Sequence, residues 1–338
     1  MIVWLTMELA AASSLWPVEV GQTIEGIAVE LGDPQLASVI RGLNGLPPGA
    51  QPRIGRLLKL PDQASTSEQD AFLELTVGEV TVTTQGGRPQ AAQRLVALPT
   101  GAQVCTGANS YALLHVATTC AEDGPVGDGV VLWSDTCITL RAVGATRAGR
   151  ATVVEVDQGS LVVADPKEVT GRVTVVAGAG MATGTGGFRV HLESDDALRA
   201  ESLTSRLALL GDDQQLDLEA GKGARVQADG QLSATVDLLK PGGLVRPDVG
   251  EPLRRVQFRW TPNAEAFGYR VTLSGDAAGN GILHARALTT PVYAPELLLL
   301  PVAPGEPVWW RVAALDRLGF LGIPTPTRPF GLPWGGTP

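Results

Sequence analysis

The chain has 338 residues and a formal net charge of −9, with 44% hydrophobic and 18% charged residues. This much apolar material can build cores, so wholesale disorder is excluded, and the length suggests two or three domains. The acidic balance argues against a nucleic-acid partner, because phosphate contacts need clustered lysine and arginine. No run of about 20 apolar residues occurs, so we expect no transmembrane helix. The 41 glycines and 24 prolines favour many turns and short strands over long helices.

The segment 1–15 has some features of an export signal. It starts with an apolar run and passes into small residues suited to cleavage. However, Glu8 interrupts the apolar run and no lysine or arginine precedes Arg41, whereas such signals need a basic start and an unbroken hydrophobic region. We interpret the segment as a degraded or mis-started signal, with a structural first strand as the alternative.

Residues 16–61 carry the patterns of a strand, two helices and a second strand, in that order. Val18 and Val20 indicate the first strand, and the run 58–60 indicates the second. Thr23 is placed to cap the first helix. The apolar positions expected to face the core of this unit are Ile24, Ile27, Ala28, Leu31, Leu36, Val39, Ile40 and Leu43.

This unit resembles a LysM module, through the motif W-P-V-x-V-G-Q-T-I-x-x-I-A, a turn at Asn44 and the closing run I-G-R-L-L-K-L-P. The resemblance implies that the unit binds N-acetylglucosamine chains, chiefly peptidoglycan, in a shallow groove between two loops. Carried over to this chain, the glycan-binding residues are Gly21, Gln22, Thr23, Ile24, Ile54, Gly55 and Arg56. Two departures are Gln22, where an acidic residue is usual, and the proline-rich stretch before Ile54. The alternative is a LysM fold that docks onto a neighbouring domain and has lost its affinity for sugar.

Residues 62–71 are polar and aperiodic and indicate a linker. Short alternating runs separated by glycine turns then predict a β-domain over 72–230. This part resembles a FecR-type periplasmic β-domain, on five landmarks that follow in order at 78–80, 101–107, 159–163, 184–188 and 220–223. The glycines of these landmarks are expected to permit turns and close backbone approach, and none is expected to take part in catalysis.

Three patterns suggest a cofactor site, a metal site or a catalytic site, but the spacing or context of their residues does not match such sites. The stretch 173–187 imitates a dinucleotide fingerprint, but a strand-like run follows it instead of the helix that should hold the pyrophosphate. The cysteines and histidines lack the paired spacing of a zinc site. No G-x-S-x-G motif is present, and we expect half-exposed strand positions for His115, His191 and His284. We therefore expect no cofactor, no metal site and no catalytic residues.

Cys120 and Cys137 bracket an insertion rich in glycine and aspartate. A disulfide between them would close this hairpin in an oxidising periplasm and contribute about 3 kcal/mol. Cys105 would then be left over. The alternative is three buried free thiols.

The last part of the chain alternates again. Residues 231–252 contain prolines and glycines that break every period and indicate a second linker, and 333–338 form a tail. Between them, 253–332 resemble a fibronectin type III-like sandwich, through the motifs F-x-W, G-Y-R-V and W-R-V-A-A-L-D-x-x-G. The resemblance implies that Trp260 and Tyr269 fill the core between two sheets.

The strongest strand pattern of this part runs over 308–316. The residues expected to face its core are Val308, Trp310, Val312 and Ala314. Trp309 and Arg311 then point outward together. Because exposed tryptophan and arginine are enriched at binding hot spots, this pair is a candidate contact for a protein partner. The alternative is that Trp309 packs beneath a neighbouring loop.

Together these patterns predict a mainly β multidomain protein of the bacterial periplasm or cell envelope. We expect the protein not to be an enzyme. In this prediction the LysM-like unit tethers the chain to peptidoglycan, and the β-domains scaffold envelope proteins of unknown identity. The alternative is a FecR-type sensor that regulates a sigma factor, which needs a membrane-crossing helix and a cytoplasmic segment, and neither pattern appears. A cell-wall hydrolase would need paired carboxylates in a cleft, whereas the aspartate pairs at 195–196 and 212–213 have turn patterns.

Overall fold

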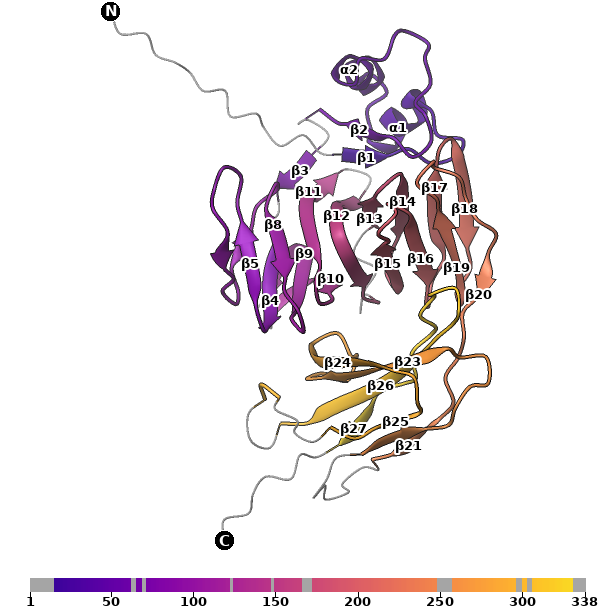
Figure 1. Cartoon of the computed structure of the whole chain (residues 1–338). Coiled ribbons are helices and arrows are strands. Elements are labelled where there is room, and N and C mark those ends of the chain that lie inside the picture. Colours follow the sequence, from indigo (N-terminus) through magenta and orange to yellow (C-terminus); the bar gives the residue numbers. More distant parts are fainter. Residues whose placement is uncertain are drawn as a thin grey trace, which may run out of the picture.

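The structure is a computed structural model that describes residues 15–61, 65–68, 71–121, 124–146, 149–165, 172–247, 257–295, 300–302 and 306–330. Apart from Leu15, the expected signal segment lies outside the described residues, as does the expected tail. The described part is mainly β, with several sheets and two helices, which confirms this level of the expected fold class. None of the helices in that part is long and apolar enough to cross a membrane. Figure 1 shows an N-terminal, a large central and a C-terminal unit in sequence order.

The N-terminal unit contains β1 (Leu15–Pro17), α1 (Ile24–Glu30), α2 (Leu36–Leu43) and β2 (Leu57–Lys59), and β1 pairs antiparallel with β2. This is the expected order, although the first strand ends before Val18 and Val20. Thr23 caps α1 as expected, because its hydroxyl accepts a hydrogen bond from the Gly26 backbone nitrogen at 3.0 Å.

The buried side of α2 differs from the expected one. Leu36 and Ile40 are buried, but Val39 is 44% and Leu43 46% exposed, and Ala37 takes the inward position. A unit with two helices covers only one side of α2. The helix therefore buries a narrower stripe than the apolar surface that its sequence offers.

The central unit contains two sheets. The first has the strand order β6-β5-β8-β11-β12-β13-β14-β17-β18, and β3 pairs with the end of β11. The second has the order β7-β4-β9-β10-β12-β15-β16-β19-β20. The strands are β3 (Ser65–Glu68), β4 (Ala71–Val77), β5 (Val80–Thr83), β6 (Gln90–Ala91), β7 (Ala97–Leu98), β8 (Gln103–Thr106), β9 (Tyr111–Ala121), β10 (Gly124–Leu132), β11 (Cys137–Thr146), β12 (Gly149–Val163), β13 (Arg172–Ala177), β14 (Gly180–Gly184), β15 (Phe188–Leu192), β16 (Leu198–Ser202), β17 (Leu207–Gly211), β18 (Gln214–Leu218), β19 (Lys222–Val226) and β20 (Val236–Asp237).

One strand, β12, belongs to both sheets. Its residues 149–158 pair in the first sheet and 159–163 pair in the second, so the strand changes sheet at Gly159. Gly159 has φ +85°, and a Cβ there would lie 2.5 Å from Thr136 Oγ1, so a side chain would be both strained and obstructed. The two sheets enclose one continuous core made of the alternate residues of their strands.

The C-terminal unit is a sandwich of two small sheets. One has the order β21 (Leu244–Arg246), β22 (Phe258–Trp260), β25 (Val292–Tyr293), and the other β24 (Ile282–Leu288), β23 (Gly268–Ser274), β26 (Val308–Leu315), β27 (Arg328–Phe330). The four positions of β26 expected to face the core are buried between the sheets. Trp260 packs edge-to-face on Tyr269 with 5.3 Å between ring centroids.

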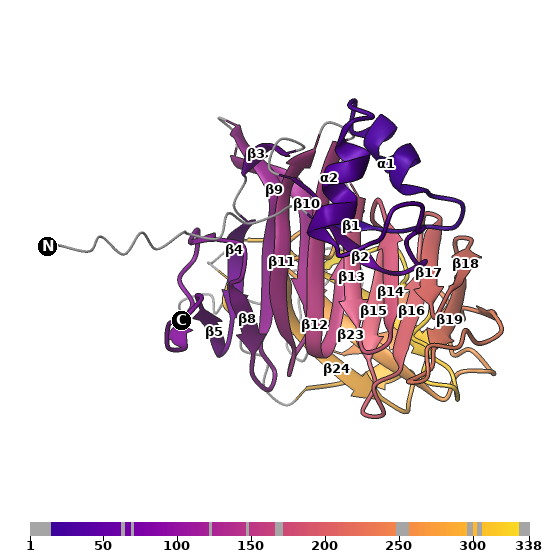
Figure 2. The same cartoon turned by 90° about the horizontal axis from the view of Figure 1, so that it is seen from above.

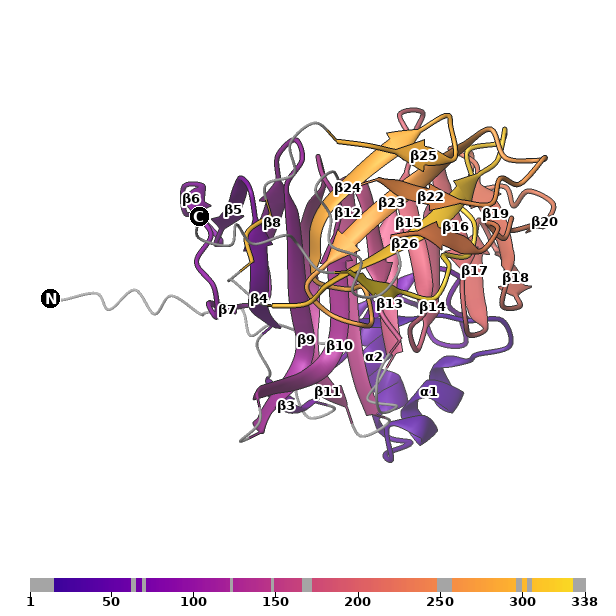
Figure 3. The same cartoon turned by 90° about the horizontal axis from the view of Figure 1, so that it is seen from below.

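The three units pack against one another. The N-terminal unit lies against the first central sheet (Figure 2), where Glu19 pairs with Arg172 of β13 and the Val20 backbone nitrogen donates to Gln215 of β18. The four-stranded sheet of the C-terminal unit lies across the outer face of the second central sheet (Figure 3), and an apolar cluster that includes Tyr111, Leu113, Val131 and Ile282 joins the two. The expected linkers differ from the structure, since 65–68 form β3 and the stretch 231–252 contains β20 and β21.

Candidate functional site

A cavity with a volume of about 1190 Å³ lies between the second central sheet and the four-stranded sheet of the C-terminal unit. A smaller cavity of about 320 Å³ adjoins it, and both are lined by Trp133, Arg189, Arg270 and Leu321. Each sheet turns its polar alternate positions toward this space, because its apolar positions fill its own core. The junction of the two units is therefore hollow and charged, and it is the candidate site.

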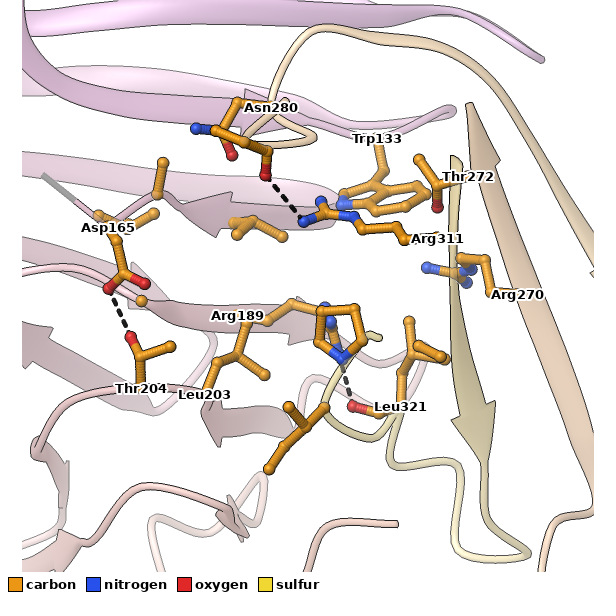
Figure 4. Close-up of a pocket in the computed structure, with 18 residues that line it drawn as sticks. Trp133, Asp165, Arg189, Leu203, Thr204, Arg270, Thr272, Asn280, Arg311 and Leu321 are labelled. Atoms are coloured by element: carbon orange, nitrogen blue, oxygen red, sulfur yellow. Dashed lines mark hydrogen bonds between the residues drawn. The ribbon is translucent and has the colours of Figure 1, made fainter. Parts of the chain in front are cut away.

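Three arginines line the smaller cavity. Arg189 comes from β15, Arg270 from β23 and Arg311 from β26, and Figure 4 shows their side chains reaching toward a common space. Among the described lining residues the acidic one is Asp165, whose carboxylate accepts a hydrogen bond from Thr204. Positive charge from two units thus converges on one small space.

Arg189 and Glu201 oppose each other on β15 and β16 and together bind the C-terminal unit. Arg189 Nη1 donates to Leu321 O at 2.6 Å and to Glu201 Oε2 at 3.2 Å. Glu201 Oε1 accepts a hydrogen bond from the Leu321 backbone nitrogen at 3.0 Å and lies 3.4 Å from Arg199 Nε. Burial lowers the pKa of Arg189, while the charge of Glu201 opposes that shift. Because Glu201 is fully buried, two arginines rather than water compensate its charge.

Arg270 has no carboxylate partner of this kind. Its guanidinium lies 4.6 Å from the ring centroid of Trp133, and within the described residues nothing accepts a hydrogen bond from it. Burial, and then the positive charges of Arg189 and Arg199, lower the pKa of Arg270 to about 10. The group is still protonated at neutral pH, and the charge of Glu201 and the face of the Trp133 ring both favour its charged form.

Arg311 is bound to its own unit. Its Nη1 and Nη2 donate to the carbonyl oxygens of Ala278 at 3.2 Å and Gly279 at 2.8 Å, in the turn between β23 and β24. Burial and the charge of Arg189 lower the pKa of Arg311 to about 10. Arg311 therefore forms a fixed, positive part of the cavity wall.

The outward face of β26 does not present a free Trp309–Arg311 pair. Arg311 lines the cavity, and Trp309 is half-buried opposite Pro329 of β27. The two residues share one face of the strand as the alternation predicts, but the central unit covers much of that face. Sequence periodicity identifies the outward side of a strand and cannot show what a second unit places on it.

Two buried donors of side chains that line the smaller cavity have no hydrogen-bond partner in the described part of the chain, namely Trp133 Nε1 and Arg189 Nε. Leaving a buried donor unsatisfied costs about 1–3 kcal/mol. His191, in the wall of the larger cavity, is uncharged at neutral pH because burial, and then Arg199 and Arg270, lower its pKa to about 4. Across the described ranges, no three histidine, cysteine, aspartate or glutamate side chains are grouped to hold a metal ion.

Six of the seven predicted glycan-binding residues lie in two neighbouring loops of the N-terminal unit, Ile24 begins α1, and they do not all face outward. Gly21 (φ +78°) and Arg56 are exposed, whereas Ile24 is fully buried in the core of the unit. Gln22 Oε1 accepts hydrogen bonds from Trp16 Nε1 at 3.3 Å and from the Glu19 backbone nitrogen at 3.0 Å. This side chain therefore shapes the turn instead of pointing into a groove.

The remaining predicted positions also serve the fold. Thr23 is engaged as the cap of α1, and Ile54 and Gly55 are half-buried. A Cβ at Gly55 would lie 3.3 Å from the carbonyl oxygen of Gly211 in β17, so this loop abuts the central unit. On the other loop, the Val20 backbone nitrogen donates to Gln215 Oε1 at 2.9 Å. Both rims of the predicted groove thus border the central unit.

The disulfide differs from the expected one. Cys137 is bonded to Cys105, with 4.1 Å between their Cα atoms, and not to Cys120. The two residues face each other across β8 and β11, whereas Cys120 lies opposite Pro125 in the hairpin of β9 and β10. Between Cys120 and Cys137, the strand β10 pairs with β9. Cys137 then begins β11, which pairs with β8 and so places Cys137 beside Cys105.

Comparisons with known proteins add little. No family model and no curated protein matches the chain. Two crystal structures of a candidate anti-sigma factor from Parabacteroides distasonis align with 40% of this chain and 59% of their own length, at 13% identity and TM-scores of 0.30 and 0.29. A β-1,2-glucanase from the same organism aligns with 80% of this chain and 40% of its own, at 13% identity and a TM-score of 0.22. This chain thus spans less than two thirds of each of these proteins. At such scores the likeness carries no argument about fold or function.

Proposed function

We propose that this chain is a non-catalytic binding protein of the bacterial cell envelope. In this proposal the LysM-like N-terminal unit binds the N-acetylglucosamine glycan of peptidoglycan, and the FecR-like and fibronectin-like β units form a rigid support for other envelope proteins. The observation that carries it is the N-terminal unit itself, whose two strands, Thr23-capped first helix, second helix and glycine turns follow the order of its sequence motif.

The contacts between units support a role as a rigid support. Glu19 forms an ion pair with Arg172 of β13, and the Val20 backbone nitrogen is bound by Gln215. A glycan held at the exposed turn of Gly21 and by Arg56 would then have a fixed orientation relative to the β units. The disulfide at Cys105 agrees with an oxidising compartment.

Two groups in the wall of the larger cavity are poorly suited to proton transfer. Glu201, one of six acidic residues among the described residues of that wall, is engaged by Arg189, Arg199 and a backbone nitrogen. His191 lies in the same wall with its pKa lowered to about 4, far below the range suited to a general base at neutral pH.

Co-sedimentation of the full chain with purified peptidoglycan tests the proposal. Arg56 donates to Asn44 O at 3.0 Å and is otherwise exposed, so Arg56→Glu should fold normally and bind about five-fold more weakly, as expected for the loss of one hydrogen bond. Arg88→Glu, the same charge change on an exposed turn of the central unit, is the matched control and should bind like the unmodified chain.

Soluble N-acetylglucosamine oligomers should compete with peptidoglycan for the chain and reduce the amount of protein in the sediment. If the unmodified chain stays in the supernatant at all peptidoglycan concentrations, the N-terminal unit is a docking element of the fold without affinity for sugar. If the Arg56 and Arg88 variants bind peptidoglycan equally weakly, the binding depends on the net charge of the chain and not on the predicted groove.

A further inference from the structure

Three arginines line the smaller cavity, and the acidic residue among its described lining residues is Asp165, which Thr204 already engages. Arg189 shares Glu201 with Arg199, and Arg311 is bound to uncharged carbonyl groups. Arg270 is half-buried over the ring of Trp133, and Glu201 is the carboxylate whose charge favours its protonated form. Burying an uncompensated charge is costly, so a cavity of this kind favours an anion as occupant.

The buried donors without partners also favour an anionic ligand. Trp133 Nε1 and Arg189 Nε are buried without partners in the described residues, and both side chains line this cavity. Trp133 is 6% and Arg189 5% exposed, so bulk water satisfies neither. Both groups, like the arginine heads, donate and never accept hydrogen bonds. A ligand that fits them must carry acceptor atoms.

Much of the rest of the wall is apolar, although Asp165, Thr204, Thr272 and Asn280 also line it. The apolar side chains of the wall include Val162, Leu203, Ala313, Leu321, Ile323 and Pro324. The volume of about 320 Å³ lies at the lower end of the range of small-molecule sites. An inorganic ion would leave this apolar surface uncovered, whereas a small organic body would cover it.

We propose that this cavity binds a small organic anion, with its carboxylate or phosphate group on the guanidinium groups of Arg270 and Arg189 and its apolar body against Leu203 and Ile323. The ligand enters through the larger cavity, whose wall shares Arg270 and Trp133 with the smaller one. This site is distinct from the glycan groove and does not depend on it.

The test uses the full chain and four probes: benzoate, phenyl phosphate, inorganic phosphate and neutral benzamide. Isothermal titration should show saturable one-to-one binding of benzoate or phenyl phosphate, and the tighter of the two identifies the head group. Arg270→Gln should weaken that binding at least about ten-fold, as expected for a hydrogen bond to a charged group. Arg259→Gln, on the other sheet of the same unit, removes the same charge from an exposed position and should leave the affinity unchanged.

The melting temperature of the ligand-free variant shows that it is folded. Because Arg270 has no carboxylate partner to leave behind, Arg270→Gln should melt at or above the temperature of the unmodified chain. The proposal is overturned if no organic anion binds with a Kd below about 10 mM. It is also overturned if benzamide binds as tightly as benzoate, if inorganic phosphate binds as tightly as phenyl phosphate, or if the Arg270 and Arg259 variants lose affinity equally.

Discussion

Removing the charge of Glu201 tests how the central and C-terminal units are joined. The side chain of Glu201 is 1% exposed and forms ion pairs with Arg189 Nη1 at 3.2 Å and Arg199 Nε at 3.4 Å. In Glu201→Gln the amide oxygen can still accept the hydrogen bond of the Leu321 backbone nitrogen. The change therefore removes mainly the charge and leaves Arg189, whose side chain is 6% exposed, without its counterion.

Breaking a buried ion pair from one side costs about 3–5 kcal/mol, because the remaining charge stays buried. A typical domain is stable by only about 5–15 kcal/mol, so this variant should lose a large share of its stability. Urea unfolding followed by tryptophan fluorescence measures the loss, and Trp260 and Trp310 in the C-terminal core report on that unit. We expect an earlier transition for the C-terminal unit, because Glu201 and Arg189 both bind Leu321.

Asp217→Asn is the matched control. Asp217 pairs with Arg206 on the surface, where the two side chains are 35% and 66% exposed, so losing that charge should cost at most about 1 kcal/mol. A loss for Glu201→Gln no greater than that of the control would refute the reasoning. The charge of Glu201 would then be dispensable for joining the units.

Two further predictions concern the disulfide and the pH dependence of stability. Cys105→Ser or Cys137→Ser should each cost about 3–4 kcal/mol, because the bridge closes a loop with a sequence separation of 32, whereas Cys120→Ser should keep the bridge. Peptide mapping without reductant checks the pairing, and a linked Cys120–Cys137 peptide would disprove it. His191 binds a proton near pH 6.5 when unfolded but near pH 4 when folded, so its contribution to stability is present above pH 6.5 and is lost as the pH falls toward 4. Between pH 7 and 4.5 the unmodified chain should therefore lose up to about 3 kcal/mol more than His191→Gln in urea unfolding, and equal losses would contradict the buried, neutral imidazole.

Local patterns predicted the parts of the fold that local interactions determine. Thr23 lies where an N-cap is needed, and its hydroxyl accepts the expected hydrogen bond. The alternation at 308–314 predicted the core face of β26, because only one face of this strand is turned toward the core between the two sheets of its unit. Gly159 was one of the glycine landmarks, and its backbone allows β12 to pass from one sheet to the other.

Pairings between distant segments could not be predicted in this way. The partner of Cys137 depends on which strand lies beside β11, and that is settled by the register of the whole first sheet. Likewise, Arg189 and Arg270 occupy outward positions in alternating strands, a pattern typical of a solvent-facing side. Only the docking of the two sheets places these arginines in one cavity.

The two proposed sites have different relations to the docking of the units. The N-terminal unit and the C-terminal unit lie on opposite sides of the central unit (Figure 1), so a glycan at Gly21 does not need the junction with the C-terminal unit. An anion at that junction contacts Arg189 of the central unit and Arg270 of the C-terminal unit, so it binds tightly only when the two are docked. By mass action such a ligand also stabilises the docked state. The junction therefore couples ligand binding to the geometry of the β units, and Glu201 contributes to both because it holds Arg189 in place.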